Sequence, residues 1–395
     1  MNLNLNYLAD RFIFWHLKKI SHGYLELVDS RGDKHFFGNI DSSLKTKVKI
    51  NSPTFSLKLL RKGSAGLGES YINNEFEAEN LPSLIELSAR NINITYKFSG
   101  FFQFGFIKNF IKKNILSNTK KRSEKNIALH YDLGNEFFST WLDKTLTYSC
   151  GIFNSSKETL EKAQINKYNK LIDLIKPRPG DKILEIGCGW GGFAEHLATN
   201  YDIQLDCITI SKKQLLYTKE RVRRLGLNKK VNVQMLDYRE VKKKYNCIVS
   251  IEMIEAVGER YLDVYFKSIK ENLVTGGRAA IQSIVIHDNL YDRYRTKEDF
   301  IQKFIFPGGL LPSIKSLNAS SDKSGLKIES YKLYGHHYSN TLQKWREGFL
   351  NSWDKISRQG FDSSFKKMWD FYLSYCEAGF KSKNIDLIQF SLCRK

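Results

Sequence analysis

The feature that most constrains the fold is a glycine turn, LEIGCGWGGFAEHLA, which spans residues 184–198. Four glycines fall within six residues, between an apolar run typical of a buried strand and an amphipathic run typical of a helix. Gly187, Gly189 and Gly192 fill the three glycine positions of a GxGxxG pattern. Glycines there let the backbone come very close to a ligand at the N-terminus of a helix. The turn therefore predicts a nucleotide-type cofactor site in an α/β fold.

The alternation of strand and helix continues beyond this turn. Apolar, strand-like runs occupy 182–187, 206–210, 231–236, 247–252, 278–286 and 386–394. Helical patterns fall at 193–200, 212–226, 339–358 and 362–378. Apolar strands separated by helices predict a parallel sheet that is covered by helices on both faces. By contrast, residues 20–95 alternate short strand-like runs with turns before one helical pattern, which predicts a small α+β domain.

The acidic residues near the turn discriminate between cofactors. A dinucleotide site needs an acid at the end of the second strand, for the ribose hydroxyls. Here that strand ends with Thr209 and Ser211, while Asp206 lies at its beginning. Glu185 precedes the glycines, and an acid there suits the cationic methionine end of S-adenosylmethionine better than a pyrophosphate. The residues favour S-adenosylmethionine over NAD or FAD.

The net charge of +20 narrows the choice of partner. It indicates a polyanion, either nucleic acid or an anionic membrane surface, unless it only reflects the lysine-rich composition of an AT-rich genome. Glu252 and Glu255 follow the fourth strand, where acids are a poor surface for phosphates, and no RNA-binding motif is evident. We therefore expect no nucleic-acid partner.

The cysteines and the hydropathy pattern predict the location. The six cysteines lie far apart and form no CxxC pair, which indicates neither a zinc site nor a disulfide framework. We expect no metal site and a cytoplasmic location. No signal peptide is evident, and no segment approaches the roughly 18 apolar residues of a membrane span. A protein of this kind meets a membrane only peripherally, at its inner face.

The segment 101–126 combines apolar and basic residues. Phe104, Ile107, Ile111 and Ile115 lie about one helical turn apart, and lysines take the other faces. This pattern fits a helix at the surface of an anionic bilayer. A helix packed on the protein itself, with solvated lysines, fits equally well. The sequence therefore divides into three expected regions. They are a small lipid- or membrane-associated domain over 1–100, a basic amphipathic linker helix over 101–126 and a catalytic domain over 127–395.

Several blocks together resemble the cyclopropane-fatty-acyl-phospholipid synthase family. In family order they are HYDLGNEFFSTWLDKTLTYSCGIF (130–153), LEIGCGWGGFAEHLA (184–198), TISKKQLLYTKERV (209–222), IVSIEMIEAVGERYLDVYF (248–266), FIQKFIFPGGLLPS (300–313), HHYSNTLQKW (336–345) and MWDFYLSYCEAGF (368–380). GLGESYINNEFEAENL (66–81) is similar to the family's smaller domain. The resemblance implies a Rossmann-like class I methyltransferase domain, with a mostly parallel seven-stranded sheet and helices on both faces, plus a small N-terminal α+β domain.

The activity that this resemblance implies is transfer of a methyl group from S-adenosylmethionine to the cis double bond of a phospholipid acyl chain in an anionic membrane. The resulting carbocation closes to a cyclopropane when a base removes a proton. In the family, bound bicarbonate is thought to be that base. The residues that would hold it here are Cys150, Glu255, Gln282, Ile284 and Tyr338.

Two residues at the implied site raise questions of mechanism. Gln282 departs from the better-known members, which carry histidine, and glutamine cannot shuttle a proton. This departure leaves a methyl- or methylene-branched product open. Cys376 matches a cysteine sometimes proposed as the family's nucleophile, although carbocation chemistry needs no covalent enzyme intermediate.

The resemblance also assigns a cofactor shell. Tyr148 and Ser149 would lie over the methionine end, and Asp237 and Tyr238 near the adenine. The rest of the shell is Glu185, Gly187, Gly189, Gly191, Thr209, Ile210 and Gln214. The family further implies a homodimer through the smaller domain. A small amine or sphingolipid acceptor, a nucleic-acid-binding protein and an inactive lipid carrier are the alternative functions.

Overall fold

The computed structural model describes residues 2–98, 118–119, 122–123, 126 and 133–394. The predicted linker helix over 101–126 therefore lies almost wholly outside the described residues and stays a prediction. Contacts divide the chain into two compact units. The first comprises Met1–Asn114, Arg293–Ile305 and Trp353–Asn384, and the second comprises Ile115–Asp292, Phe306–Ser352 and Ile385–Lys395. The catalytic domain expected over 127–395 thus takes in two segments whose contacts are with the N-terminal unit.

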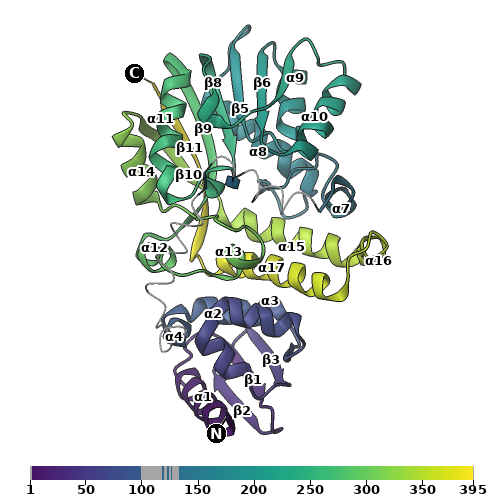
Figure 1. The fold of residues 1–395 in the computed structure, drawn as a ribbon, viewed down its shortest axis with the longest axis vertical. Helices are drawn as coiled ribbons and strands as arrows, with labels where there is room; N and C mark the ends of the chain where they lie inside the picture. The colour runs from purple at the N-terminus through teal and green to yellow at the C-terminus, as the bar shows by residue number, and fades with distance from the viewer. Residues whose placement is uncertain (1, 99–117, 120–121, 124–125, 127–132, 395) are drawn as a thin grey trace. The chain divides into compact units, whose positions relative to one another are not determined.

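The second unit is built on a seven-stranded sheet of order β10-β11-β9-β8-β5-β6-β7 (Figure 1). The strands are β5 (Lys182–Ile186), β6 (Gln204–Thr209), β7 (Val231–Met235), β8 (Tyr245–Ile251), β9 (Leu273–Ile286), β10 (Lys327–Leu333) and β11 (Ile385–Cys393). The five strands from β9 to β7 are parallel, whereas β11 lies antiparallel between β9 and β10. The predicted mostly parallel seven-stranded sheet is confirmed.

Helices cover both faces of this sheet because successive residues of its buried strands point to opposite sides. Ile183 belongs to one apolar cluster with Leu197 of α9, and its neighbour Leu184 belongs to a second cluster with Phe266 of α11. The first cluster is covered by α8 (Leu160–Ile175), α9 (Gly192–Asn200) and α10 (Lys212–Arg224), and the second by α11 (Leu262–Asn272) and α14 (Ile314–Lys323). The helices predicted for both faces are confirmed.

The order of the strands also fixes where a ligand can bind. From β5 the chain crosses to β6 on one side, and β8 pairs with β5 on the other. The carboxyl ends of β5 and β8 therefore flank the point where the strand order reverses, which is where open α/β sheets bind ligands. In register, Ile251 at the end of β8 pairs with Gln282 of β9. The residues that follow β5 and β8 thus reach the same edge as Gln282.

The remaining elements of the second unit are short helices and one long one. They are α7 (Asn135–Trp141), η1 (Tyr238–Glu240), η2 (Ile254–Ala256), η3 (Glu259–Tyr261), α12 (Asp288–Tyr294), which runs on into the first unit, and α15 (Gly335–Asn351). The helix expected over 339–358 ends at Asn351 and is followed by α16 (Trp353–Ser357).

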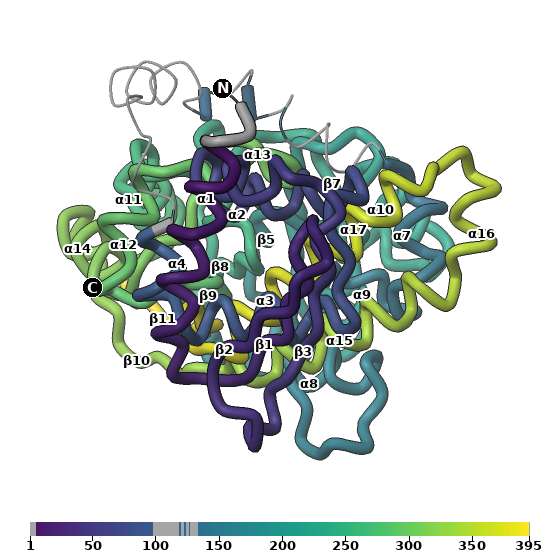
Figure 2. Tube along the Cα trace, turned by 90° about the horizontal axis from the view of Figure 1, so that it is seen from below, coloured from purple at the N-terminus to yellow at the C-terminus, as the bar shows by residue number. Residues whose placement is uncertain are grey.

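The first unit has its own four-stranded sheet, of order β2-β1-β3-β4. Its strands are β1 (Tyr24–Val28), β2 (Lys34–Gly38), β3 (Lys45–Ile50) and β4 (Phe76–Ala78), and β1, β2 and β3 lie side by side in Figures 1 and 2. Its helices are α1 (Asn2–Leu17), α2 (Phe55–Ile72), α3 (Leu81–Arg90), α4 (Ile92–Phe98), α13 (Phe300–Phe304), α16 and α17 (Ser363–Lys381). The predicted small α+β domain is confirmed.

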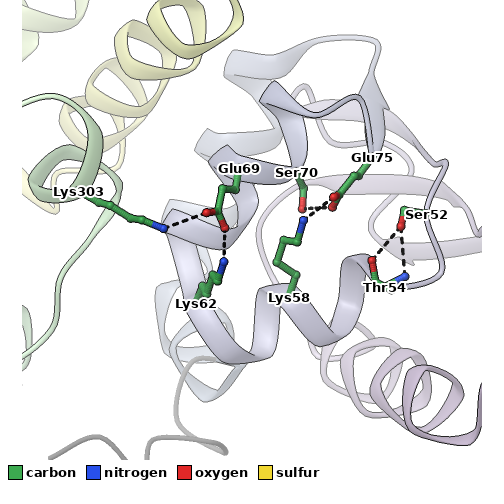
Figure 3. A network of polar contacts seen from close by, with 8 residues as sticks. All are labelled: Ser52, Thr54, Lys58, Lys62, Glu69, Ser70, Glu75 and Lys303. Atoms are coloured by element: carbon green, nitrogen blue, oxygen red, sulfur yellow. Dashed lines mark hydrogen bonds and ion pairs between the residues drawn. The ribbon is translucent and has the colours of Figure 1, made fainter. Parts of the chain in front are cut away.

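A polar network ties α13 to α2 within this unit (Figure 3). Glu69 of α2 accepts hydrogen bonds from Lys303 at 3.0 Å and from Lys62 at 2.6 Å. Nearby, Glu75 accepts from Ser70 at 2.8 Å and pairs with Lys58. These contacts explain why the segment around α13 belongs with the N-terminal residues. Both acids lie in the GLGESYINNEFEAENL stretch, so its charged residues have a structural role.

The glycines of α2 also allow close packing against apolar rings. A Cβ at Gly68 would lie 2.2 Å from the Phe300 ring and 3.2 Å from the Phe371 ring. Both rings are fully buried. We expect Gly68→Ala to lower the free energy of unfolding by about 1–3 kcal/mol, because the buried rings must shift. Urea denaturation measures this loss. Arg61→Ala, at an exposed position of the same helix, is the control, and equal stabilities of the two variants would contradict the prediction.

Candidate active site

The turn after β5 has the backbone conformation that its glycines predict. Gly187, Gly189 and Gly191 have φ values of 83°, 52° and 82°, in the left-handed region that favours glycine. A Cβ at Gly191 would lie 2.7 Å from the Thr218 side chain, which also donates to the Gly189 carbonyl at 3.0 Å. At Gly189 a Cβ would meet no atom within 4 Å. Helix α10 thus holds the turn from one side, and the space beside Gly189 is open.

A buried acid and a polar pair lie close to this turn. The Glu185 carboxylate is almost fully buried and accepts from the Cys207 thiol at 3.4 Å. Burial raises its pKa to about 7. Thr209 donates to Gln214 at 3.0 Å, which joins the end of β6 to the first turn of α10, and Ile210 lies between them in the chain. A cationic ligand beside Glu185 would favour its charged form. The open space and the buried acid therefore fit the methionine end of S-adenosylmethionine.

Aromatic rings line the chain before Cys150. The Tyr148 ring lies 5.0 Å from the Trp345 ring and 5.3 Å from the Phe138 ring, between centroids, and Tyr338 packs edge-on against Trp345. Ser149 accepts from Lys167, a fully buried lysine, at 2.7 Å. Tyr148 and Ser149 therefore belong to an apolar, largely dry wall with one cation behind it.

The residues assigned to the adenine follow β7. Asp237 forms an ion pair with Arg239 at 2.6 Å and caps η1, and the Tyr238 ring packs against Tyr265 at 5.5 Å. Both residues follow the carboxyl end of β7, at the edge of the sheet where β5 and β6 also end. Their role toward adenine stays a prediction.

Glu252 is the centre of the polar contacts beyond β8. One of its oxygens accepts from the Cys150 backbone amide at 2.9 Å and from the Gln282 side-chain amide at 2.8 Å. The other accepts from the Tyr338 hydroxyl at 2.5 Å. We define the Glu252 carboxylate and these three donors as the carboxylate cradle. The structure thus brings Cys150, Gln282 and Tyr338 together as predicted, but around a protein carboxylate.

Glu255 lies next to this cradle. One oxygen accepts from the Ile284 backbone amide at 2.5 Å, and its other oxygen is buried without a hydrogen-bond partner among the described residues. Burial and the nearby Glu252 charge raise the pKa of Glu255 to about 8. At neutral pH Glu255 is therefore mostly protonated. Burial also raises the pKa of Glu252, although the hydrogen bonds from Tyr338, the Cys150 amide and Gln282 oppose that shift.

The two cysteines of the predicted site have unreactive thiols. Burial raises the pKa of the Cys150 thiol well above its usual range, and it is the backbone amide of Cys150 that donates to Glu252. Cys376 belongs to α17 in the first unit, so it does not share a unit with the other predicted catalytic residues. Burial also raises the pKa of its thiol. A thiol with a raised pKa is a poor nucleophile.

Two residues of this region, Glu252 and Lys167, are not among the predicted site residues. In the sequence Glu252 is only an acid unfavourable to phosphates, and Lys167 is one lysine among many. Lys167 is nevertheless fully buried, and burial lowers its pKa to about 8. No sequence signal marks Lys167, because nothing in the sequence of helix α8 distinguishes this lysine from its other lysines. For Glu252, its place directly after a buried strand was the available signal.

The cradle bears directly on bicarbonate. Three of the five groups assigned to that ion, on Cys150, Gln282 and Tyr338, donate to Glu252 in this structure. The fourth, the Ile284 amide, donates to Glu255. As arranged here, the described residues do not fit a bicarbonate ion, because its hydrogen-bond donors are engaged by protein carboxyl groups.

Comparisons with known proteins agree with the fold and with the predicted family. The family model for mycolic acid cyclopropane synthetase matches residues 118–390. Tuberculostearic acid methyltransferase UfaA1 of Mycobacterium tuberculosis is 34% identical over 85% of this chain and 80% of its own length. Cyclopropane-fatty-acyl-phospholipid synthase of Escherichia coli K12 is 32% identical over 90% of each chain. These relatives confirm the resemblance on which the site residues were assigned.

A solved structure supports the same family. Mycolic acid cyclopropane synthase CmaA1, complexed with SAH and CTAB, superimposes with a TM-score of 0.64 and 26% identity, over 68% of this chain and 97% of that one. The matched family model covers more than half of the chain, and the glycine turn, the sheet order and the buried acid agree with a methyltransferase site. The chain therefore belongs to the mycolic acid cyclopropane synthetase family and is an S-adenosylmethionine-dependent methyltransferase.

Proposed function

We propose that this enzyme methylates the cis double bond of an unsaturated phospholipid acyl chain and that the product closes to a cyclopropane. The observation that carries this proposal is the carboxyl pair, Glu252 and Glu255, at the carboxyl edge of the sheet beside the aromatic wall. The relative from Escherichia coli, which is named for cyclopropane formation on phospholipids, supports this choice of substrate.

The chemistry of an alkene explains why such a site is needed. When bound, S-adenosylmethionine supplies the methyl group as part of a sulfonium cation. The two π electrons of the alkene would form the new carbon–carbon bond as the S–CH₃ bond breaks and leaves its electron pair on sulfur, so that a positive charge arises on the other alkene carbon. The rings of Tyr148 and Tyr338 offer π faces to that charge. A base must then take a proton without adding to the cation itself.

A second product is compatible with the same site. Loss of a proton from the new methyl group with ring closure gives cyclopropane. A methylene branch forms instead when a 1,2-hydride shift first moves the positive charge to the methylated carbon and the methyl group then loses a proton. Gln282 stands where better-known members carry histidine, and the 34%-identical relative is named a methyltransferase rather than a cyclopropane synthase. A small amine or a sphingolipid is the alternative acceptor.

The reaction is tested in a bacterial host rich in cis-monounsaturated lipids. We expect expression of this chain to add one CH₂ to monounsaturated acyl chains, as measured by fragmentation mass spectrometry of the extracted lipids. The fragments distinguish a ring from a methylene branch. Lipids without any added CH₂ would contradict the proposal and favour a small-molecule acceptor.

The cofactor site can be tested by a substitution that spares the fold. Gly189 has open space beside it and a φ that asparagine tolerates. We expect Gly189→Asn to weaken S-adenosylmethionine binding by about 100-fold, because the new side chain fills the ligand's space. Isothermal titration calorimetry measures this change. The control is Gly226→Asn, at a position beyond α10 with φ of 68° and equally open surroundings. If both variants bind like the wild type, the ligand does not lie beside Gly189.

We further propose that the protein acts on the surface of an anionic membrane. Among the described residues, no helix has the length and hydropathy to cross a bilayer. Helix α1 exposes Leu5, Leu8 and Trp15, which are 46%, 55% and 55% exposed and share one face of the helix. Helix α1 itself carries one acid and one base, Asp10 and Arg11, so attraction to anionic lipid would come from the net charge of +20 of the whole chain, while these apolar side chains would enter the interface. The homodimer through the smaller domain and the absence of a nucleic-acid partner stay predictions.

Vesicle binding tests the membrane proposal. We expect binding in a flotation assay to rise with the fraction of anionic lipid and to fall with salt, because salt screens the attraction. Trp15→Ala should weaken binding about tenfold, since it removes a large apolar contact at the interface. Phe36→Ala, another exposed aromatic residue of the first unit, is the matched control. Equal binding to neutral and anionic vesicles would contradict the electrostatic part of the proposal.

A further inference from the structure

The three donors of the carboxylate cradle hold an anion that is part of the chain, the Glu252 side chain. Both oxygens of Glu252 accept hydrogen bonds, from the Cys150 and Gln282 amides on one side and from the Tyr338 hydroxyl on the other. A carboxyl group whose two oxygens both accept hydrogen bonds and donate none has the pattern of an ionised carboxylate. The three donors come from three separate parts of the sequence. Their convergence on one side chain is therefore a built feature of the tertiary structure.

The orientation of Gln282 supports this arrangement. Its side-chain oxygen accepts from the Gln389 amide at 2.8 Å, which turns its nitrogen toward Glu252. Gln282 and Gln389 are both buried, so water does not compete for these hydrogen bonds. Gln282 can therefore donate to an anion in the cradle but cannot accept a proton there. The proton acceptor in the cradle must therefore be the group to which Gln282 donates, the Glu252 carboxylate.

The backbone of Glu252 is also unusual. Its φ is 49°, in the left-handed region, directly after the last residue of β8, and its amide donates to the Gln282 carbonyl at 2.8 Å. A residue with a side chain pays a steric cost of order 1 kcal/mol there, and such residues cluster at functional sites. The turn directs the Glu252 carboxylate onto the donors of β9 and α15.

The charges around Glu252 keep it available as a base. Burial raises the pKa of Glu252, while its three hydrogen bonds and the positive charge of the buried Lys167 oppose that shift and favour the carboxylate. Glu255, on the other side, is mostly protonated at neutral pH, so it does not compete for a proton. Glu252 remains partly accessible, as a group that meets a substrate must be.

We infer that Glu252 is the base of the reaction and that this enzyme needs no bicarbonate. The inference rests on the proposed function. A C–H bond of the newly added methyl group breaks, its electron pair forms the third bond of the ring, and the proton goes to a Glu252 oxygen. Three hydrogen bonds to the carboxylate reduce its tendency to add to the cation. Cys150, Gln282 and Tyr338 act as positioning residues, since they work through Glu252.

The experiment measures methyl transfer to vesicles of unsaturated phosphatidylglycerol by the purified, full-length enzyme in buffer freed of carbon dioxide. We expect the wild-type rate to be the same with and without added bicarbonate. The Glu252→Gln substitution should lower the rate of methyl transfer by about 10²-fold or more, which is the usual contribution of a general base. The variant should still bind S-adenosylmethionine normally in calorimetry. Glu271→Gln, the same exchange at an exposed residue of α11, should keep the wild-type rate.

A second variant keeps the test independent of folding. Glu252→Gly relieves the left-handed backbone and empties the cradle for a small anion. We expect its rate to recover about tenfold when bicarbonate is added, which a purely structural role of Glu252 would not produce. A wild-type enzyme that requires bicarbonate, or a Glu252→Gln variant that keeps its activity, overturns the inference. If the proposed function itself is wrong, the wild-type enzyme adds no CH₂ to the lipid with or without bicarbonate, which distinguishes that outcome from failure of the inference about Glu252.

Discussion

The hydrogen bonds to the Glu252 carboxylate are the interaction on which the rest of the site depends. A carboxylate withdrawn from water costs several kcal/mol unless donors and an opposite charge replace its hydration. Here the replacement comes from the Cys150 backbone, from Gln282 of β9, from Tyr338 of α15 and from the charge of Lys167 on α8. Each element must keep its place for the charge to be tolerated. The site thereby fixes the packing of α8 and α15 around the sheet.

The same arrangement suits the chemistry of an alkene. A carbocation is destroyed by water and by any free nucleophile, so the site has to be dry and its base restrained. The rings of Tyr148, Trp345 and Phe138 exclude water on one side. The thiol of Cys150 is kept protonated by burial. What remains is one hydrogen-bonded carboxylate beside one protonated partner, which separates the roles of two neighbouring acids by their environments.

Much of the fold could be predicted because its signals are local. The core strands are short apolar runs, and β5, β6, β8 and β11 lie within a few residues of where the sequence puts them. The edge strand β10 was missed because KIESYKL is almost wholly exposed and lacks an apolar alternation. Helix α2 contains three glycines, which disfavour a helix, yet Gly68 is required there by the approach of Phe300. Tertiary packing overrides local propensity at both places.

The sequence alone determined the class of the fold, the glycine turn, the dependence on S-adenosylmethionine and the family. These depend on short-range patterns: strand and helix periodicity, left-handed glycines and an acid before the turn. Only the tertiary structure decided which carboxylate lies among the donors of Cys150, Gln282 and Tyr338, and that Lys167 is buried behind it. Those residues are distant in the chain and of ordinary types. Their chemistry arises from mutual distance and burial, and neither quantity exists until the sheet and its helices have packed.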